Sequence, residues 1–428
     1  MKKLPAFFGA SFGVAVAVGS IIGAGILRAP HDVAQLLPHA WMFLGVWVLG
    51  GVYALLGANV FSELGAMRPR SGGQYAIALH AFGPFTAFAV GWNDWVSICG
   101  SVAAVSIVFA EAVTTLVGIP QYALAISMLA AIAAGFVLLR GSRAMNASQN
   151  FTSLAKTLGF LALTIACFTW AAGHQRAPEV AAVAPSQGLL LSLVLALQGV
   201  IFAYDGWTGI IYFGEETRDP ARDIPRSLFG GVISVMIVYL LLNVAILLVL
   251  PMSTIAADAL PTAAAATTVF GSSGSTIVRL LIVIALPSSI LANQAMGSRV
   301  AFALGRDMKR LSALGNATDS GAPTVSVILG VIVTLAFLLT GTFERVIAIC
   351  SILFVASYAV SFAALFRMRA VEPSTPRPFR AIGHPITTGL VLVGSVAFLI
   401  GTAVAAPRDT AIAAALVLVS YPVYRLLR

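Results

Sequence analysis

Long apolar runs separated by short polar stretches cover almost the whole of this 428-residue chain. A helix that crosses a bilayer needs about 20 apolar residues. The chain is therefore expected to be an all-α polytopic membrane protein, because only helices and closed barrels satisfy their backbone within lipid. Twelve spans are predicted, at 7–28, 40–66, 84–117, 121–139, 148–172, 188–213, 226–250, 275–304, 323–341, 344–366, 386–406 and 410–427.

Two of the predicted spans contain glycine close to their middle. The first holds GSIIGAGI, Gly19 to Ile26, and the second holds FAYDGW, Phe202 to Trp207. Glycine is a poor helix former, so each stretch favours local unwinding. Unwound backbone is tolerated at membrane depth only where it faces protein or a polar cavity. Such a pair, in the two halves of a chain, indicates the substrate site of a transporter.

Both breaks also have plainer interpretations. Gly19 and Gly23 have the spacing that lets two membrane helices approach closely, and Asp205 is suited to cap the helix that follows it. A carboxylate at membrane depth nevertheless costs about 3 kcal/mol and is a functional candidate by default. An unwound first segment would present N–H groups to a carboxylate, and an unwound second segment would present carbonyls to an ammonium group.

Composition excludes an ordinary soluble domain. Hydrophobic residues make up 59% of the chain and charged residues 10%, whereas soluble domains carry roughly 25% charged residues. Lys2 and Lys3 precede the first apolar run as in a signal peptide. No convincing small-residue cleavage site follows them, so we treat that run as a retained helix.

The net charge of +9 has a simple explanation in the placement of the lysines and arginines. Twelve spans put both termini on one side, and the connections on that side carry eighteen of these residues against five on the other. The remaining two, Lys156 and Arg299, lie within predicted spans. Positive residues favour the cytoplasmic side. We therefore predict a protein of the inner, or plasma, membrane with both termini in the cytoplasm, and no nucleic-acid partner.

Polar residues within the spans have two kinds of interpretation. Lys156 lies about 12 Å into its span and either snorkels to the surface or is a fixed cation in a polar site, where a metal ion would otherwise sit. Glu63, Asp94 and Arg299 lie in the inner parts of three spans. We expect these three to form an inward-facing ion-pair cluster, with a gating or a structural role.

The sequence contains no pattern typical of an enzyme. Cys99, Cys167 and Cys350 lie in apolar segments and are interpreted as small core residues. The five histidines have no metal-ligand spacing. We expect no catalytic residue, no metal and no cofactor.

Three longer stretches match family motifs: GSIIGAGILRAP from Gly19, SELGAMRPRSGGQYAIALHAFGP from Ser62 and FAYDGWTGIIYFGEETRDPARDIPRSL from Phe202. They resemble the amino acid–polyamine–organocation superfamily, and more closely its L-type amino acid transporter branch. The resemblance implies a LeuT-type fold, with a ten-helix core at 1–366 and a two-helix hairpin at 386–428. The core would consist of inverted repeats at 1–172 and 188–366.

The resemblance also implies where the substrate binds. Phe202 would be the outer gate, and Lys156 would stand in for the sodium ion of sodium-coupled relatives. Family members often carry serine where Ala24 stands, so one hydroxyl contact is missing here. The implied substrate-binding residues are Ser20, Ile21, Gly23, Ala24, Gly25, Phe202, Ala203, Tyr204, Asp205 and Gly206.

The predicted function is sodium-independent transport or exchange of L-amino acids by alternating access, with neutral amino acids favoured. Cationic or dibasic substrates remain an alternative, because AYDGW with Asp205 is similar to carriers of both classes. A proton- or sodium-coupled symporter is a further alternative. A membrane enzyme and a substrate-sensing receptor are disfavoured, since neither a catalytic cluster nor a large cytoplasmic extension is visible. The expected partners are the substrate and membrane lipid. The sequence shows no cysteine-bearing outer loop that would tether a partner subunit, so we expect no obligatory partner subunit.

Overall fold

The computed structural model describes residues 6–37, 39–174, 188–340 and 343–427, without the side chains of 340 and 343–346. Lys2, Lys3 and most of the connection between the predicted spans 148–172 and 188–213 lie outside these residues. Within them the secondary structure is helical, and the extended pairings are two isolated bridges, Phe8 with Thr217 and Ser71 with Phe213.

Every predicted span contains helix. The first part of the chain forms α1 (Ala10–Ile21), α2 (Ala24–Leu36), α3 (Ala40–Met67), α4 (Gln74–Phe82), α5 (Pro84–Val117), η1 (Pro120–Tyr122), α6 (Ala123–Leu139) and α7 (Ser142–Gly173). The next part forms α8 (Leu189–Tyr204), η2 (Gly209–Tyr212), η3 (Gly214–Glu216), α9 (Pro220–Val249), α10 (Met252–Ala257), α11 (Pro261–Phe270), η4 (Gly271–Ser273) and α12 (Gly274–Asp307). The last part forms η5 (Lys309–Gly315), α13 (Thr324–Thr340), α14 (Phe343–Val371), α15 (Ile386–Ala405) and α16 (Pro407–Leu427).

The helices confirm an all-α multi-pass membrane protein. In the described part of the chain, nine helices are long and apolar enough to cross a membrane, or ten if the bent pair α1 and α2 is one span. The apolar helices α8 and α13 are shorter than that. The described helices therefore do not reach twelve full-length spans, although each predicted span is occupied.

Two segments differ from the simple pattern of spans and connections, for identifiable reasons. Residues 251–274, between two predicted spans, contain the short helices α10 and α11, and α11 begins at Pro261, a residue well suited to the first helical position. The predicted span 188–213 ends as an α-helix at Tyr204. After that residue the backbone becomes extended and then continues only in the 3₁₀ turns η2 and η3.

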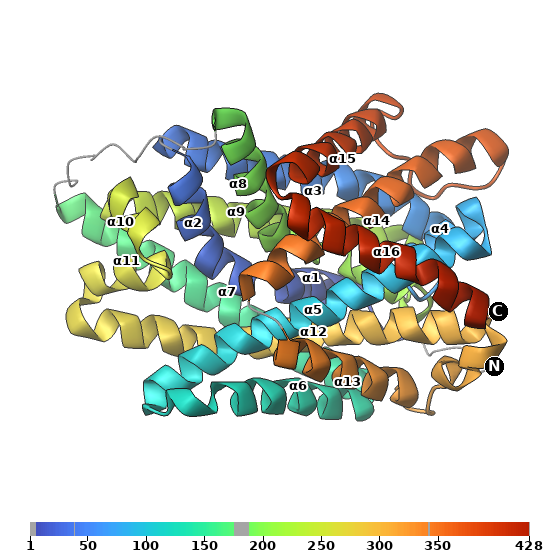
Figure 1. Ribbon diagram of the computed structural model, residues 1–428, viewed down its shortest axis with the longest axis horizontal. Coiled ribbons are helices and arrows are strands. Elements are labelled where there is room, and N and C mark those ends of the chain that lie inside the picture. The colour runs from blue at the N-terminus through green and yellow to red at the C-terminus, as the bar shows by residue number, and fades with distance from the viewer. Residues whose placement is uncertain (1–5, 38, 175–187, 341–342, 428) are drawn as a thin grey trace.

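The bundle brings together helices that are far apart in the sequence. The helix α1 packs against α7, α9 and α12, and α2 packs against α8. The long helix α5 packs against α12 and α14 in the middle of the bundle, with α16 lying over it (Figure 1). Consequently the two glycine-broken segments, on α1–α2 and after α8, both face the centre.

Large apolar side chains also cover the outside of the bundle. Leu129, Leu154, Ile165 and Leu190 are 60–74% exposed. Such an apolar surface marks contact with lipid. The centre, by contrast, contains buried serines, asparagines and charged groups. Polar chemistry is therefore concentrated where the broken segments lie.

Candidate functional site

The first break separates α1 from α2. The helix α1 ends at Ile21 and α2 begins at Ala24, and the two are bent by 44°. Gly23 is the N-cap of α2, and no side chain caps the N–H groups of its first turn. The break falls within the predicted glycine stretch, so the predicted unwinding is confirmed.

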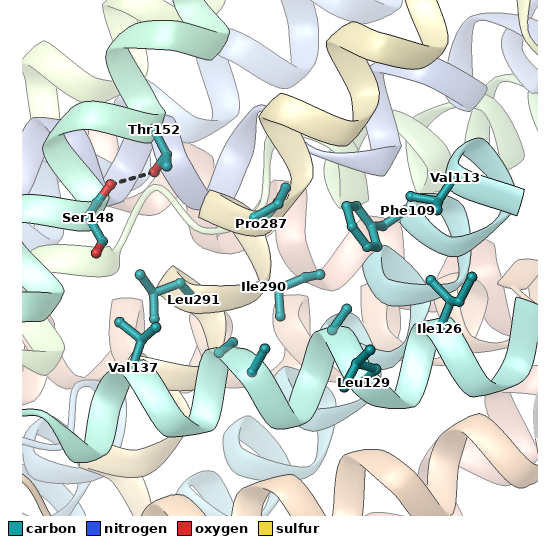
Figure 2. Close-up of a pocket in the computed structure, with 13 residues that line it drawn as sticks. Phe109, Val113, Ile126, Leu129, Val137, Ser148, Thr152, Pro287, Ile290 and Leu291 are labelled. Atoms are coloured by element: carbon teal, nitrogen blue, oxygen red, sulfur yellow. Dashed lines mark hydrogen bonds between the residues drawn. The ribbon is translucent and has the colours of Figure 1, made fainter. Parts of the chain in front are cut away.

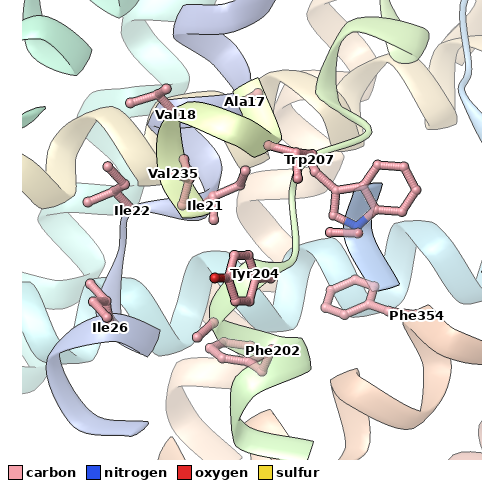
Figure 3. Close-up of a cluster of buried hydrophobic side chains, with 14 of the residues drawn as sticks. Ala17, Val18, Ile21, Ile22, Ile26, Phe202, Tyr204, Trp207, Val235 and Phe354 are labelled. Atoms are coloured by element: carbon pink, nitrogen blue, oxygen red, sulfur yellow. The ribbon is translucent and has the colours of Figure 1, made fainter. Parts of the chain in front are cut away.

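The second break follows α8. Asp205 has the extended torsions φ −61° and ψ 151°, and Gly206 has φ +101°, a region that L-residues with a Cβ rarely adopt. This break falls within the predicted FAYDGW stretch, so the predicted unwinding is confirmed here too. The chain continues as the 3₁₀ turn η2, whose N-cap is Thr208 and which no side chain caps, so the interpretation of Asp205 as a helix cap is wrong. Figure 3 shows Ile21 and Ile22 of the first break in one buried cluster with Phe202 and Tyr204.

Two glycines allow the breaks to touch. A Cβ on Gly25 would lie 2.5 Å from the Cα of Ala203. A Cβ on Gly206 would lie 2.6 Å from both the Cβ and the Oγ of Ser20. Real side chains do not approach this closely, so these two positions require glycine for the observed packing.

Hydrogen bonds from two hydroxyl groups join the breaks. Ser20 Oγ lies 2.9 Å from the carbonyl of Gly206 and 2.7 Å from that of Val16 in its own helix, so its one proton can go to either. Tyr239 OH, on α9, lies 2.7 Å from the carbonyl of Ile21 and 3.0 Å from that of Ala203. Freed carbonyls need such partners at membrane depth. Tyr239 was not predicted, although a lone tyrosine within the apolar span 226–250 was an available signal.

Lys156 lies behind the first break. Its Nζ is 2.8 Å from the carbonyl of Gly19, 2.7 Å from that of Ile22 and 2.9 Å from Ser289 Oγ. An ammonium group has three donors, and all three find an acceptor here. The residue is 0% exposed, so the snorkelling interpretation is wrong. The cation is fixed at the carboxyl end of α1, where a helix favours positive charge.

A cavity of about 20 Å³ lies between the two breaks, enough for about one water molecule. Its lining residues are Ser20, Ile21, Gly23, Ala24, Gly25, Ser101, Val105, Phe202, Asp205 and Asn293. Seven of these are among the predicted site residues. Ala203, Tyr204 and Gly206 do not line the cavity, and Lys156 stands behind it. Ser101, Val105 and Asn293 were missed, although the side chains of Ser101 and Val105, four residues apart on one helix, were a usable signal.

Asp205 is the acidic residue at the cavity. Tyr358 OH, on α14, donates a hydrogen bond to its Oδ1. Tyr358 is 2% exposed and packs against Trp207 with ring centroids 5.1 Å apart. Tyr358 was not predicted either. It ties α14 to the second break through the carboxylate.

Two of the larger cavities lie on the outside of the bundle and are apolar. One has a volume of about 530 Å³ between α5, α6, α7 and α12, and Figure 2 shows Phe109, Leu129, Pro287 and Leu291 around it. The lining contains the hydroxyls of Ser148 and Thr152 but no charged group. Such a surface suits hydrocarbon, and it offers no ionic partner to a zwitterion.

The expected ion-pair cluster of Glu63, Asp94 and Arg299 is wrong. Arg299 is paired with Glu216 of η3 at 3.1 Å, and Glu63 is paired with Arg369 at 2.5 Å. Asp94 accepts hydrogen bonds from neutral side chains. The partners come from other elements: η3 for Arg299, α14 for Glu63, and α4 and η2 for Asp94. Span positions alone do not reveal such contacts.

Comparison with known proteins identifies the family. The family model described as amino acid permease matches residues 12–422. The chain is 24% identical to the serine/threonine exchanger SteT of Bacillus subtilis over 426 residues, which are 97% of this chain and 95% of that protein. It is 27% identical to the human b(0,+)-type amino acid transporter 1 over 395 residues, 89% of this chain and 80% of that protein.

A shorter match is to the mouse Asc-type amino acid transporter 1, at 31% identity over 242 residues, 54% of this chain and 45% of that protein. These relatives are transporters, not enzymes. Among the described residues, no group of three or more His, Cys, Asp or Glu could hold a metal ion. With its broken helices around a central cavity, the chain belongs to the amino acid permease family of the amino acid–polyamine–organocation superfamily, whose members transport amino acids.

Proposed function

We propose that this protein is a sodium-independent transporter of small neutral L-amino acids that works by alternating access. The observation that carries this proposal is the position of Lys156, whose Nζ binds the carbonyls freed at the end of α1. A fixed cation there makes a bound metal ion unnecessary for holding the break open.

The cavity offers complementary ends to an amino acid. The N-terminus of α2 has no side-chain cap, so its N–H groups and positive dipole end suit the substrate carboxylate. The end of α8, with Asp205 beside it, suits the ammonium group. Phe202, 8% exposed, would close over the substrate as a gate.

The preference for small substrates rests on the lining and on the relatives. Ala24, Ser101 and Val105 are small, and the cavity of about 20 Å³ describes a closed state that must widen to admit a substrate. SteT, similar over nearly the whole chain, is a serine/threonine exchanger. A cationic substrate is the second candidate, favoured by the Asp205 carboxylate at the cavity.

The proposal includes the organisation of the chain. Residues 1–172 and 188–366 would be inverted repeats of a ten-helix core, and 386–428 an appended hairpin. Both termini would be cytoplasmic in the plasma membrane, and the chain would work without a partner subunit. Rocking of one bundle against the rest would then expose the cavity alternately to each side.

Uptake into proteoliposomes tests the proposal. We expect labelled serine to be taken up equally well in sodium and in choline buffer. Lys156→Met removes the ammonium but keeps most of the side-chain volume, so we expect the initial rate to fall at least about tenfold, or about 1.4 kcal/mol. Lys309→Met, the same change at an exposed position, is the matched control and should transport normally.

Two outcomes would contradict the proposal. A requirement for sodium would show that Lys156 does not replace the ion. Normal uptake by a Lys156→Met protein that elutes as a single species would reduce Lys156 to a packing role.

A further inference from the structure

Asp94 is a buried carboxyl group that the substrate site does not use. It lies on α5, is 1% exposed, and accepts hydrogen bonds from two side chains. Tyr212 OH lies 3.0 Å from both carboxyl oxygens, and Gln74 Nε2 lies 3.3 Å from Oδ1. Gln74 in turn accepts from Ser361 Oγ of α14 at 3.3 Å. The network thus joins α4, α5, η2 and α14.

No positive group balances Asp94 within the described residues. The titratable groups that face it are Tyr212 from η2, Tyr358 from α14 and the like-charged Asp205 from the second break. On α12, which packs against α5, Arg299 is engaged by Glu216 at 3.1 Å. On α14, Arg369 is engaged by Glu63.

The other helices that pack against α5 supply no counter-charge either. The helices α6 and α13 contain no charged residue, and those of α16 lie near its two ends. On α4, His80 contacts Glu372. On α2, Arg28 pairs with Glu111, far along α5 from Asp94.

Keeping a buried carboxyl group ionised without a counter-charge costs a large desolvation free energy. The group avoids that cost by taking up a proton. Intramembrane carboxyls of this kind act as proton relays in transporters. The partners of Asp94, a phenol and an amide, can serve both the neutral and the ionised carboxyl group.

Asp94 lies close enough to the cavity for its protonation to affect substrate binding. Ser101, which lines the cavity, lies two turns further along the same face of α5, about 10 Å away along the axis. Tyr212 belongs to the segment that follows the break at Gly206. A change of charge on Asp94 strengthens or weakens its bond to Tyr212, and therefore acts on the segment that borders the substrate.

We propose that Asp94 binds a proton that crosses the membrane with the amino acid. The carboxyl takes the proton from water on the outer side and returns it to water on the inner side once in each cycle. Each transport cycle would then carry one amino acid together with one proton. This inference rests on the proposed function and specifies the ion to which transport is coupled.

The test uses the full-length protein in proteoliposomes with a trapped pH indicator. An inward serine gradient at equal pH should acidify the lumen in the wild type. We expect Asp94→Asn to abolish this acidification, while counterflow of labelled serine at equal pH remains within about threefold. Glu111→Gln is the matched control on the same helix, with a partly exposed carboxylate already paired with Arg28, and should acidify like the wild type.

The outcomes separate the two proposals. Counterflow by the wild type without acidification would overturn proton coupling and leave amino acid transport standing. Acidification by Asp94→Asn at the wild-type rate would overturn the assignment to Asp94. No counterflow with any amino acid would overturn the proposed function and this inference together. If Asp94→Asn aggregates, Asp94→Glu, which keeps the carboxyl, must retain acidification for the proposal to stand.

Discussion

At the scale of single residues, the centre of the protein depends on a few polar side chains that hold unwound backbone. Lys156 and Tyr239 bind carbonyls freed by the breaks, and both are 0% exposed. Loss of one partner would leave a buried acceptor unpaired, which costs about 1–3 kcal/mol. Asp205 differs from them because it is among the residues that line the cavity.

Asp205→Asn tests the substrate class at this scale. If the substrates are small and neutral, as proposed, the Asp205 carboxylate would position the second break through Tyr358 and would not contact the substrate side chain. We therefore expect serine and alanine uptake to fall together, by roughly tenfold or about 1.4 kcal/mol. The measurement is initial uptake by Asp205→Asn and by Tyr358→Phe, which removes the hydroxyl donor.

A selective loss would favour the other candidate. If arginine is carried by the wild type and lost in Asp205→Asn while serine uptake is unchanged, the carboxylate recognises a cationic side chain. That result would favour cationic amino acids over small neutral ones as the substrate class.

At the scale of elements, glycine sets how closely two helices pass. The start of α2 touches the end of α8 because Gly25 has no Cβ to meet the backbone of Ala203. The second break has the same requirement at Gly206, with the added demand of its positive φ. Close contact between the breaks is thus a property of two positions rather than of the whole glycine stretch.

Gly25→Ala should separate these elements. The added Cβ would lie 2.5 Å from backbone, and overpacking of this kind typically costs about 1–3 kcal/mol. We expect a lower midpoint of thermal unfolding and slower serine uptake. Gly45→Ala on α3 is the control, because nothing lies within 4 Å of its added Cβ. Gly45→Ala should leave the free energy of unfolding unchanged or raise it by up to about 1 kcal/mol. Equal effects at the two positions would argue against the close-approach explanation.

At the scale of the whole molecule, the charge asymmetry predicts orientation. The connections assigned to the cytoplasm carry eighteen lysines and arginines against five on the other side. Ion pairs also tie the helix ends that this prediction places on the cytoplasmic side, such as Arg299 with Glu216 and Arg70 with Asp307 at 2.7 Å. Contact between these helix ends is therefore electrostatic as well as apolar.

Cysteine labelling in intact cells tests the orientation. The native thiols Cys99, Cys167 and Cys350 are buried, so a membrane-impermeant maleimide should label the wild type weakly. We expect Gln121→Cys, after α5, to be labelled from outside. Lys309→Cys, after α12, should be labelled only once the cells are opened. The reverse pattern would invert the topology and refute the cytoplasmic placement of the termini.

Much of this architecture was predictable because membrane spans are local features. The predicted span 84–117 coincides with α5, since a run of apolar residues between Gly83 and Gly118 defines both ends. The positions of the two breaks were also predictable, because glycine weakens a helix wherever it stands. The 3₁₀ turns after Gly206 were not, since contacts with α1 and α9 override the local preference for helix.

The sequence by itself determined the order of the predicted spans, each of which contains helix, and the positions of the two breaks. Its resemblance to a known family added the seven predicted residues that line the cavity. Apolar length and glycine content are properties of neighbouring residues, and so they are visible without a fold. Tertiary structure alone decided the partners: Lys156 meets Gly19 across 137 positions of the chain, and Asp94 meets Tyr212 across 118. It also turned an expected cluster of Glu63, Asp94 and Arg299 into three separate sites. Buried polar and charged side chains pair with the groups that lie next to them in space, and helix packing decides which groups those are.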